Sequence, residues 1–477
     1  MKTPMPTTAP LRLPLIALAA CVLAGCAVGP AYQRPATPEP VAFKELQGWV
    51  PAAPADALER GPWWALFNDE ELNRLAESVE VSNQNIAAAV AAYSQARALV
   101  RQQRATLFPL VSIGASGDRA GGEGGGADNR YRLSIGGSWE PDVWGRLRAG
   151  VAGAQASAEA SAADLASARL SAQGELAANY FTVRQLDAQR DLLASTIEGY
   201  RRVLQITQNR FDAGIAARSD VLQAQTQLAN AQSDELNLVR SRAQFEHAIA
   251  ILLGKAPADF ALAAAPWRVS VPEVPVGVPS TLLQRRPDIA AAERRVALAN
   301  EQIGIARSAY FPNIGLSASY GTAGSRVADL FSASTAAWSF GLSAAQTLFN
   351  AGATRASVAG AEAQHQLAVA RYRQTVLDAF ADVENQLAAT RTLAEQQELR
   401  RLAAEAASQV EEQMLNRYKA GQVSYTEVVQ AQATALSARR ALVQVQADRQ
   451  TAAVALIQAL GGGWQAARQG ADGAAPY

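Results

Sequence analysis

The stretch YFPNIGLSAS, Tyr310–Ser319, contains a helix stop followed by the start of a strand. Pro312 cannot donate a backbone hydrogen bond and disfavours a helical residue before it, so a preceding helix ends there. From Ile314 onward, apolar residues alternate with glycine and serine. This period of two is typical of a β-strand with one apolar and one polar face. The sequence therefore predicts a helix-to-strand transition at Pro312.

The same stretch occurs a second time in the chain. LFPLVSIGAS, Leu107–Ser116, precedes it by 203 positions (310 − 107). Further copies are 207 positions apart (417 − 210): Gly145–Ala149 with Gly352–Ala356, and Arg210–Gln225 with Arg417–Gln432. The step from 203 to 207 predicts four extra residues between the Phe-Pro pair and the later glycine. An offset near 200 is too long for a solenoid unit, so it indicates duplication of a half-chain.

Each half contains two alternating segments, which predict β-hairpins at about 108–140 and about 312–346. Each segment has roughly 9–11 residues, the length of a tilted membrane-spanning strand. Membrane barrels need about eight strands or more, because an open edge in lipid leaves backbone groups unpaired. Four strands of this kind therefore require several subunits to share one barrel. The alternative is a small soluble sheet with one buried face.

A long helical run follows each hairpin, and the fold class is therefore mainly α with a small β part. The runs 146–210 and 353–417 contain no proline and have 65 residues each, which is about 100 Å of helix. Their apolar residues recur at steps of three, four and seven, as on a coiled-coil seam. The runs 71–107 and 219–253 are about half as long and, stacked end to end, would match one long helix.

The N-terminus has the layout of a secretory signal peptide, with a weakly basic start and an apolar segment too short to span a bilayer. It ends in LAGC, Leu23–Cys26, which resembles the lipobox of bacterial lipoproteins. The resemblance implies cleavage before Cys26 and acylation of its sulfur (palmitate) and amino group. Ala27 in place of Asp implies sorting to the outer membrane. The alternative is an ordinary signal peptide with a chance cysteine.

These patterns predict the organisation of the chain: 1–25 signal peptide, 26–70 lipid-anchored N-terminal segment, 71–254 first repeat, 255–285 linker, 286–461 second repeat, and 462–477 C-terminal tail. Within the repeats, tip turns are expected at about 210–220 and about 417–427. Each turn stops one helix and starts the next, with a glycine that suits the left-handed conformation, a serine that can cap a helix and an acidic residue near its positive end. These residues are Gly214, Ser219 and Asp220 in the first turn, and Gly421, Ser424 and Glu427 in the second.

Taken together, the motifs resemble the outer-membrane factor family of TolC-like efflux channels, in its lipoprotein branch. Besides the two turns, they are Gly25–Pro35, Trp63 and Trp64 with Phe67, Arg285–Glu293, and Arg307–Ser319. The resemblance implies a homotrimer with a twelve-stranded barrel in outer-membrane lipid and a hollow periplasmic α-barrel. It also implies passive efflux, with a periplasmic adaptor that couples the channel to an inner-membrane pump of the RND type.

The resemblance further implies that both tips contact the adaptor and close the tunnel. The expected adaptor contacts are Arg210, Gly214, Ser219, Asp220, Gly421, Ser424 and Glu427, and the expected gate residues are Arg417, Tyr418, Tyr425, Thr426 and Gln430. The family commonly has Leu and Asp where this chain has Thr426 and Gln430. We therefore expect a gate held by hydrogen bonds and by Tyr425 or Arg417 contacts, with a weaker cation preference than an acidic ring gives.

Other classes of function have little support in the sequence. The formal net charge of zero gives no electrostatic case for nucleic-acid binding. His247 and His365 lie inside helical runs, the mature chain would hold no free Cys, and we expect no catalytic site, cofactor or metal site. The one Met left after cleavage, Met414, disfavours a dedicated copper or silver exporter. The alternatives are the exit duct of a type I secretion system, a periplasmic adaptor or a structural coiled-coil lipoprotein; the last two would not need the strands.

Overall fold

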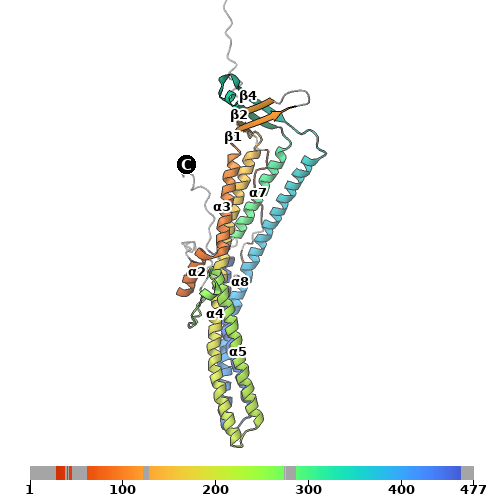
Figure 1. Cartoon of the computed structure of the whole chain (residues 1–477). Helices are drawn as coiled ribbons and strands as arrows, with labels where there is room; N and C mark the ends of the chain where they lie inside the picture. The colour runs from red at the N-terminus through yellow and green to blue at the C-terminus, as the bar shows by residue number, and fades with distance from the viewer. Residues whose placement is uncertain are drawn as a thin grey trace, which may run out of the picture. The chain divides into compact units, whose positions relative to one another are not determined.

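The computed structural model describes residues 28–37, 40, 42–45, 62–121, 128–272, 274 and 286–462 (Figure 1). The chain divides into two compact units. Met1–Thr37, Ala91–Ala162 and Ala291–Gln374 form the first, and Pro38–Val90, Ala163–Ala290 and Thr375–Tyr477 form the second. We call the first the sheet unit and the second the tip unit. Cys26, the signal peptide and residues 463–477 lie outside the described residues.

Helices of matching length recur at the spacing of the sequence repeat. In the described chain they are α4 (Arg146–Asp212) and α8 (Ala353–Lys419) with 67 residues each, α5 (Arg218–Leu252) and α9 (Tyr425–Ala459) with 35 each, and α3 (Gln84–Ala105) and α7 (Pro287–Ser308) with 22 each. The predicted long helices and the duplication are confirmed. No helix among the described residues is long and apolar enough to cross a membrane.

The predicted helical run over 71–107 is wrong in one respect, because it is broken at Asn83. α2 (Glu70–Ser82) ends there and α3 begins at the next residue. The Asn83 side-chain oxygen accepts hydrogen bonds from the backbone nitrogens of Asn85 (2.9 Å) and Ile86 (3.1 Å). It thereby occupies first-turn donors that have no partner inside the helix, which is the role of an N-cap asparagine.

Asn83 also joins two helices that are far apart in sequence. Its side-chain nitrogen donates to the backbone oxygen of Leu252, the last residue of α5, over 2.8 Å. Arg286, the matching residue before α7, donates to the backbone oxygen of Ala459, the last residue of α9, over 3.3 Å. The negative end of one helix thus meets the positive start of another. Within the tip unit, the end of α5 therefore meets the start of α3 and the end of α9 meets the start of α7, as the predicted stacking requires.

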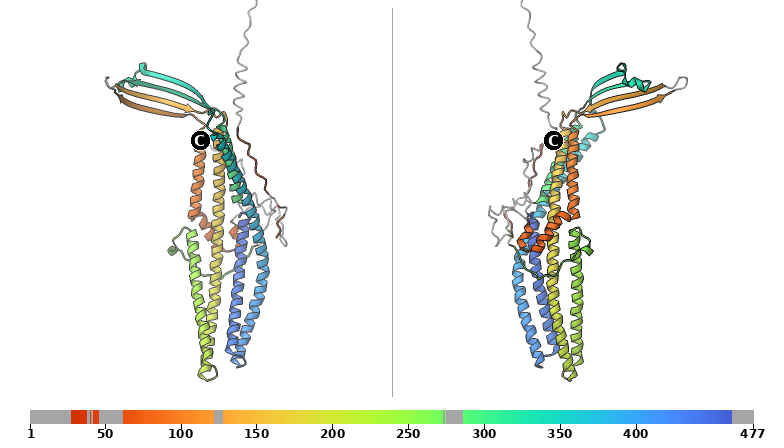
Figure 2. Two further views of the ribbon diagram at one scale, coloured as in Figure 1. Left: turned by 90° about the vertical axis from the view of Figure 1, so that its right-hand side faces the viewer. Right: turned by 60° about the vertical axis from the view of Figure 1, so that its left-hand side comes forward.

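The four strands form one antiparallel sheet in the order β1-β2-β3-β4 (Figures 1 and 2). Their bounds are β1 (Leu110–Ala120), β2 (Asp128–Trp139), β3 (Asn313–Gly324) and β4 (Ala336–Ala345). The connection between β3 and β4 spans 325–335, whereas that between β1 and β2 spans 121–127. The second connection therefore has eleven residues and the first has seven. This difference of four residues equals the step in the repeat offset from 203 to 207, so the insertion lies in the second hairpin.

The register separates the two faces of the sheet. One row across the strands contains Ile113, Ile135, Tyr320 and Trp338, and the adjacent row contains Ser112, Gly136, Ser319 and Ser339. Successive residues of a strand point to opposite faces, so one face is apolar and the other carries serine and glycine. On the polar face, the hydroxyls of Ser319 and Ser339 are 2.8 Å apart. The alternation predicted from the sequence is therefore continuous across all four strands.

The N-terminal residues 28–37 pack along α7 within the sheet unit. The Tyr32 hydroxyl donates to the carboxylate of Glu293, and the Asn300 side chain donates to the backbone oxygen of Pro30 over 2.9 Å. Gly29 and Gly304 meet so closely that a Cβ on Gly29 would lie 3.0 Å from the Gly304 Cα atom. The glycines therefore allow this segment to lie directly on the helix.

In the tip unit, buried aromatic residues and ion pairs hold irregular segments against the helices. The Phe67 ring lies 4.9 Å from that of Phe181 on α4. Asp187 on α4 pairs with Arg242 on α5 over 2.6 Å, and the same guanidinium donates to the backbone oxygen of Leu262. Arg242 thus holds the segment after α5 against the helices. Its burial is tolerated because its charge is paired with Asp187 and its donors have hydrogen-bond acceptors.

Candidate functional site at the helix tips and the sheet

Both tip turns use a glycine to end a long helix. Gly214 has φ +73° and Gly421 has φ +75°, as predicted for a left-handed residue after a helix. The backbone nitrogen of Ile215 donates to the Arg210 oxygen over 2.8 Å, and that of Gln422 donates to the Arg417 oxygen over 2.9 Å. These six-to-one bonds belong to Schellman motifs, so the two turns have the same backbone construction.

The helix starts after the two turns differ. Ser424 is the N-cap residue of α9, and the Glu427 carboxylate accepts from its backbone nitrogen (3.3 Å) and its hydroxyl (3.2 Å). In the first turn the N-cap residue is Ala217, and Ser219 lies inside the first turn of α5. The predicted cap at Ser219 is therefore wrong, because the residue that duplicates Ser424 is Ala217. Asp220 does lie in the first turn of α5, near its positive end.

Arg210 connects the first tip to the second. Its Nη1 atom donates to the backbone oxygen of Tyr418 over 2.6 Å, near the C-terminus of α8. Its guanidinium also lies 4.7 Å from the centre of the Tyr418 ring. The Tyr418 oxygen also accepts from the backbone nitrogen of Gly421 over 2.9 Å, and the Arg210 guanidinium supplies a second donor at the negative end of the α8 dipole.

Tyr418 and Tyr425 are buried between the tips. Their ring centres are 5.4 Å apart, and they pack with Val203, Ala224 and Val428 in one apolar cluster. Tyr425 is 2% exposed. Burial, followed by the charge of the neighbouring Tyr418, raises the pKa of Tyr425 well above its usual range. The structure therefore places these two expected gate residues inside the subunit rather than on its open surface.

The remaining expected gate residues are exposed. Thr426 and Gln430 lie one turn apart on α9 and both face away from the buried cluster. Arg417 is exposed at the end of α8. The structure brings Thr426 and Gln430 onto one face but separates them from Tyr418 and Tyr425. The second tip thus has a polar outer surface over an aromatic interior.

The first tip carries exposed apolar side chains that the sequence reading did not select. Phe211, Ile215 and Leu222 are 36%, 67% and 51% exposed. Their duplicates in the second tip are Tyr418, Gln422 and Val429, which are buried, polar and half-buried respectively. Residue-by-residue comparison of the two repeats was the signal that could have found them. The first tip is therefore the more apolar surface of the two.

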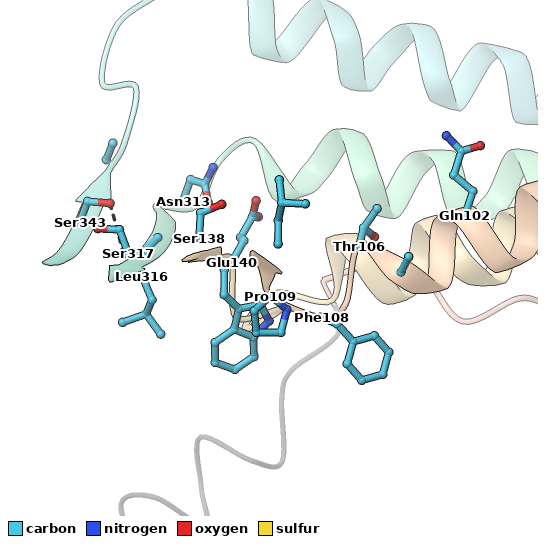
Figure 3. Close-up of a pocket in the computed structure, with 15 residues that line it drawn as sticks. Gln102, Thr106, Phe108, Pro109, Ser138, Glu140, Asn313, Leu316, Ser317 and Ser343 are labelled. Carbon is cyan, nitrogen blue, oxygen red and sulfur yellow. Dashed lines mark hydrogen bonds between the residues drawn. The ribbon is translucent and has the colours of Figure 1, made fainter. Parts of the chain in front are cut away.

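A cavity of about 870 Å³ lies in the sheet unit where the strands meet the end of α3 (Figure 3). Gln102 and Thr106 line it from the helix side, and Ser138, Ser317 and Ser343 line it from the polar face of the sheet. The serine-rich face therefore continues into an open, partly polar space. In the described chain, β1 and β4 each pair with one strand only. These two edges are available to strands of other chains.

The described geometry defines a class: an internally duplicated helical protein with a two-faced sheet whose edges are open. The family model described as outer membrane efflux protein matches residues 75–255 and 278–462, and the chain belongs to this family. The two matched ranges coincide with the two structural repeats.

Individual relatives are similar over nearly their whole length. The probable efflux pump outer membrane protein TtgC of Pseudomonas putida is 33% identical over 461 residues, which cover 94% of this chain and 95% of TtgC. The cation efflux system protein CusC of Escherichia coli is 29% identical over 451 residues, or 94% of this chain and 97% of CusC. The solved outer-membrane channel OprN shares 32% identity with a TM-score of 0.83, covering 92% of this chain and 100% of that chain.

Proposed function

We propose that this protein is the outer-membrane channel of a tripartite efflux system and conducts solutes passively. The observation that carries this proposal is the sheet, with one apolar face, one serine-glycine face and two open edges. In lipid, the edges must pair with other chains, which places the apolar face outward and the polar face around water. No chemical step and no cofactor are part of the proposal.

The strand count supports three chains as the assembled form. Four strands per chain need at least two further copies to reach a barrel that encloses a water-filled channel. A homotrimer gives twelve strands and brings six tips together, three of each kind. The location that fits is the outer membrane, with the helices in the periplasm. Cleavage before Cys26 and its acylation would add a lipid anchor, because several acyl chains hold a protein firmly in a bilayer.

The two tips have different roles in this proposal. The first exposes Phe211, Ile215 and Leu222 and supplies apolar contact area for a periplasmic adaptor, with Asp220 and Ser219 beside them. The second exposes Arg417, Thr426 and Gln430, which face the channel opening and regulate passage. Gly214, Gly421, Ser424 and Glu427 shape the turns, whereas Arg210, Tyr418 and Tyr425 hold the tips of one subunit together.

The transported solute is set by the other components. A channel without an energy source requires an inner-membrane pump, here of the RND type, connected through the adaptor. TtgC is named for an efflux pump and CusC for a cation efflux system, and this chain is similar to both over nearly its whole length. The channel therefore carries little information on cargo.

Reconstitution tests the proposal directly. The full-length protein, purified in detergent, is expected to migrate as a heat-modifiable trimer and to give ion conductance in planar bilayers. A water-soluble monomer without conductance, after removal of the lipid, contradicts it. A deletion strain is expected to become sensitive to drugs or dyes, and complementation by the wild-type gene is the control.

A further inference from the structure

The connection between β3 and β4 folds back over the apolar face of the sheet. It contains two short 3-10 helices, η4 (Val327–Phe331) and η5 (Ala333–Thr335). The Thr322 hydroxyl donates to the backbone oxygen of Leu330 over 2.7 Å. A Cβ on Gly324 would lie 2.3 Å from the Asp329 Cβ atom. The register puts Thr322 and Gly324 on the same face as Tyr320, so the connection covers the apolar side.

Between this connection and the strands lies a groove of about 530 Å³. Its apolar lining consists of Ile113, Leu133, Ile135, Tyr320, Leu330 and Phe331. Leu133, Ile135 and Tyr320 belong to the two central strands, whereas closure of a barrel uses the β1 and β4 edges. In the proposed barrel, this groove lies between the strands and the connection of one chain, on the face that meets lipid.

Two arginines outside the groove lining lie towards its hairpin end. Arg119 is exposed near the end of β1, and its position in the register puts it on the apolar face. Arg326 is the N-cap residue of η4, with its side chain 84% exposed, and its Nε atom is 4.0 Å from the Asp329 carboxylate. Because the Arg326 side chain is this exposed and this far from the Asp329 carboxylate, its guanidinium can also bind another anion. An apolar groove with cations at one end matches an acyl chain below an anionic head group.

We propose that this groove holds an acyl chain of a phosphate-bearing membrane lipid, with Arg119 and Arg326 binding its phosphate. The inference rests on the proposed channel function, because it needs the apolar face to lie in a bilayer. Transfer of a chain from bulk lipid into the groove gains no hydrophobic energy, since lipid is as apolar as the lining. Preference for this lipid therefore comes from the charge-assisted bonds to phosphate and from close packing.

Photolabelling of the full-length protein tests the proposal. The protein is reconstituted in phosphatidylcholine vesicles that contain phosphatidylglycerol with a photoreactive acyl chain, and labelled residues are identified by mass spectrometry. Label is expected to concentrate on the groove residues rather than on Phe340 and Leu342, which share the face but not the groove. Replacing both arginines by glutamine is expected to reduce groove labelling roughly fivefold. Labelling by a photoreactive diacylglycerol, which lacks phosphate, is expected to change little when the two arginines are replaced.

Matched variants separate the groove from the rest of the face. Ala336→Phe fills the groove and is expected to suppress its labelling, whereas Ala318→Phe, on the same face outside the groove, leaves it unchanged. Arg130→Gln, on the opposite face, is the control for charge. Uniform labelling of the apolar face, or labelling unaffected by Ala336→Phe, contradicts the lipid site in the groove. If the same vesicles conduct ions, the proposed channel function is unaffected by that result. If the strands are not labelled and the vesicles do not conduct ions, both the lipid site in the groove and the proposed channel function are contradicted.

Discussion

Arg210 binds the backbone oxygen of Tyr418 across 2.6 Å, whereas Arg417, its own duplicate, points into solvent. The two arginines occupy equivalent positions in the repeats, yet one joins the tips and the other does not. The difference follows from what lies opposite each of them. Tyr418 is buried and offers a ring and a carbonyl, while its duplicate, Phe211, is at the surface.

Arg210→Ala is expected to loosen the contact between the two tips. Loss of a hydrogen bond with a charged donor costs about 1.5–3 kcal/mol. Hydrogen exchange of the backbone amides in 417–425 should therefore be faster in this variant than in wild type. Arg417→Ala is the matched control, with an expected effect within about 0.5 kcal/mol because the side chain is exposed. Equal protection in both variants would show that the Arg210 bond does not hold the tips together.

Gln430→Asp is expected to increase the preference of the channel for cations. Three copies of the residue would add three negative charges to one face of the opening, where a cleft concentrates their field. The measurement is the reversal potential in a salt gradient across a planar bilayer. Gln223→Asp, at the exposed duplicate position on α5, adds the same charge to the other tip. If neither substitution changes ion selectivity, Gln430 does not face the path of the ions.

Gly214→Ala is expected to destabilise the first tip by about 1–2 kcal/mol, because a residue with a Cβ atom is strained at positive φ. The space around Gly214 is open, so backbone strain alone produces the cost. Gly199→Ala, in the middle of α4, also meets open space. There the change is expected to stabilise by about 0.5–1 kcal/mol, since alanine favours helix. Thermal unfolding of the two variants should shift in opposite directions.

Tyr200 is expected to make the tip unit sensitive to alkaline pH. Burial, and then the charge of Glu411, raises the pKa of Tyr200 to about 12, from 10.0 in the unfolded chain. Its contribution to stability is therefore complete below pH 10.0 and declines as pH rises towards about 12. Tyr200→Phe should show a smaller loss of denaturant resistance over this interval than wild type. Tyr310→Phe, at an exposed position, is the control and should behave as wild type.

Phe340→Arg and Ser339→Arg test which face of the sheet meets lipid. The two residues are neighbours on β4 and point to opposite faces. An arginine on the lipid side of a barrel costs about 2–4 kcal/mol near the bilayer centre. Phe340→Arg should therefore reduce the yield of heat-modifiable trimer, whereas Ser339→Arg should assemble and alter conductance. The reverse pattern would assign the faces the other way round.

The strands and long helices were predictable because their signals are local. Alternation after Pro312 and steps of three and four after Gly145 record which side of each element is apolar. Comparison of the two copies added the position of the insertion, which the structure places in the second hairpin. The glycine at each turn was equally clear, since few residues accept a positive φ.

The details of the site depended on contacts between distant residues. The burial of Tyr418 and Tyr425 arises where the two turns meet, so neither sequence copy reveals it alone. At the helix break, the Asn83 side chain is held by its hydrogen bond to the backbone oxygen of Leu252, which is also far away in sequence. The wrong prediction of a cap at Ser219 has a local cause. The turn contains a serine, as the second turn does, but this serine lies two positions beyond Ala217, where α5 has already begun.

The junctions at Asn83 and Arg286 determine how the helices respond to mechanical tension. A pull along α4 or α8 is opposed by the uninterrupted backbone hydrogen bonds of a single helix. A pull that separates α5 from α3 is opposed at the joint by the bond between Asn83 and Leu252, and α9 and α7 are held in the same way through Arg286. We expect the joints to yield to load before the helices do, because a helix is held by a ladder of backbone hydrogen bonds.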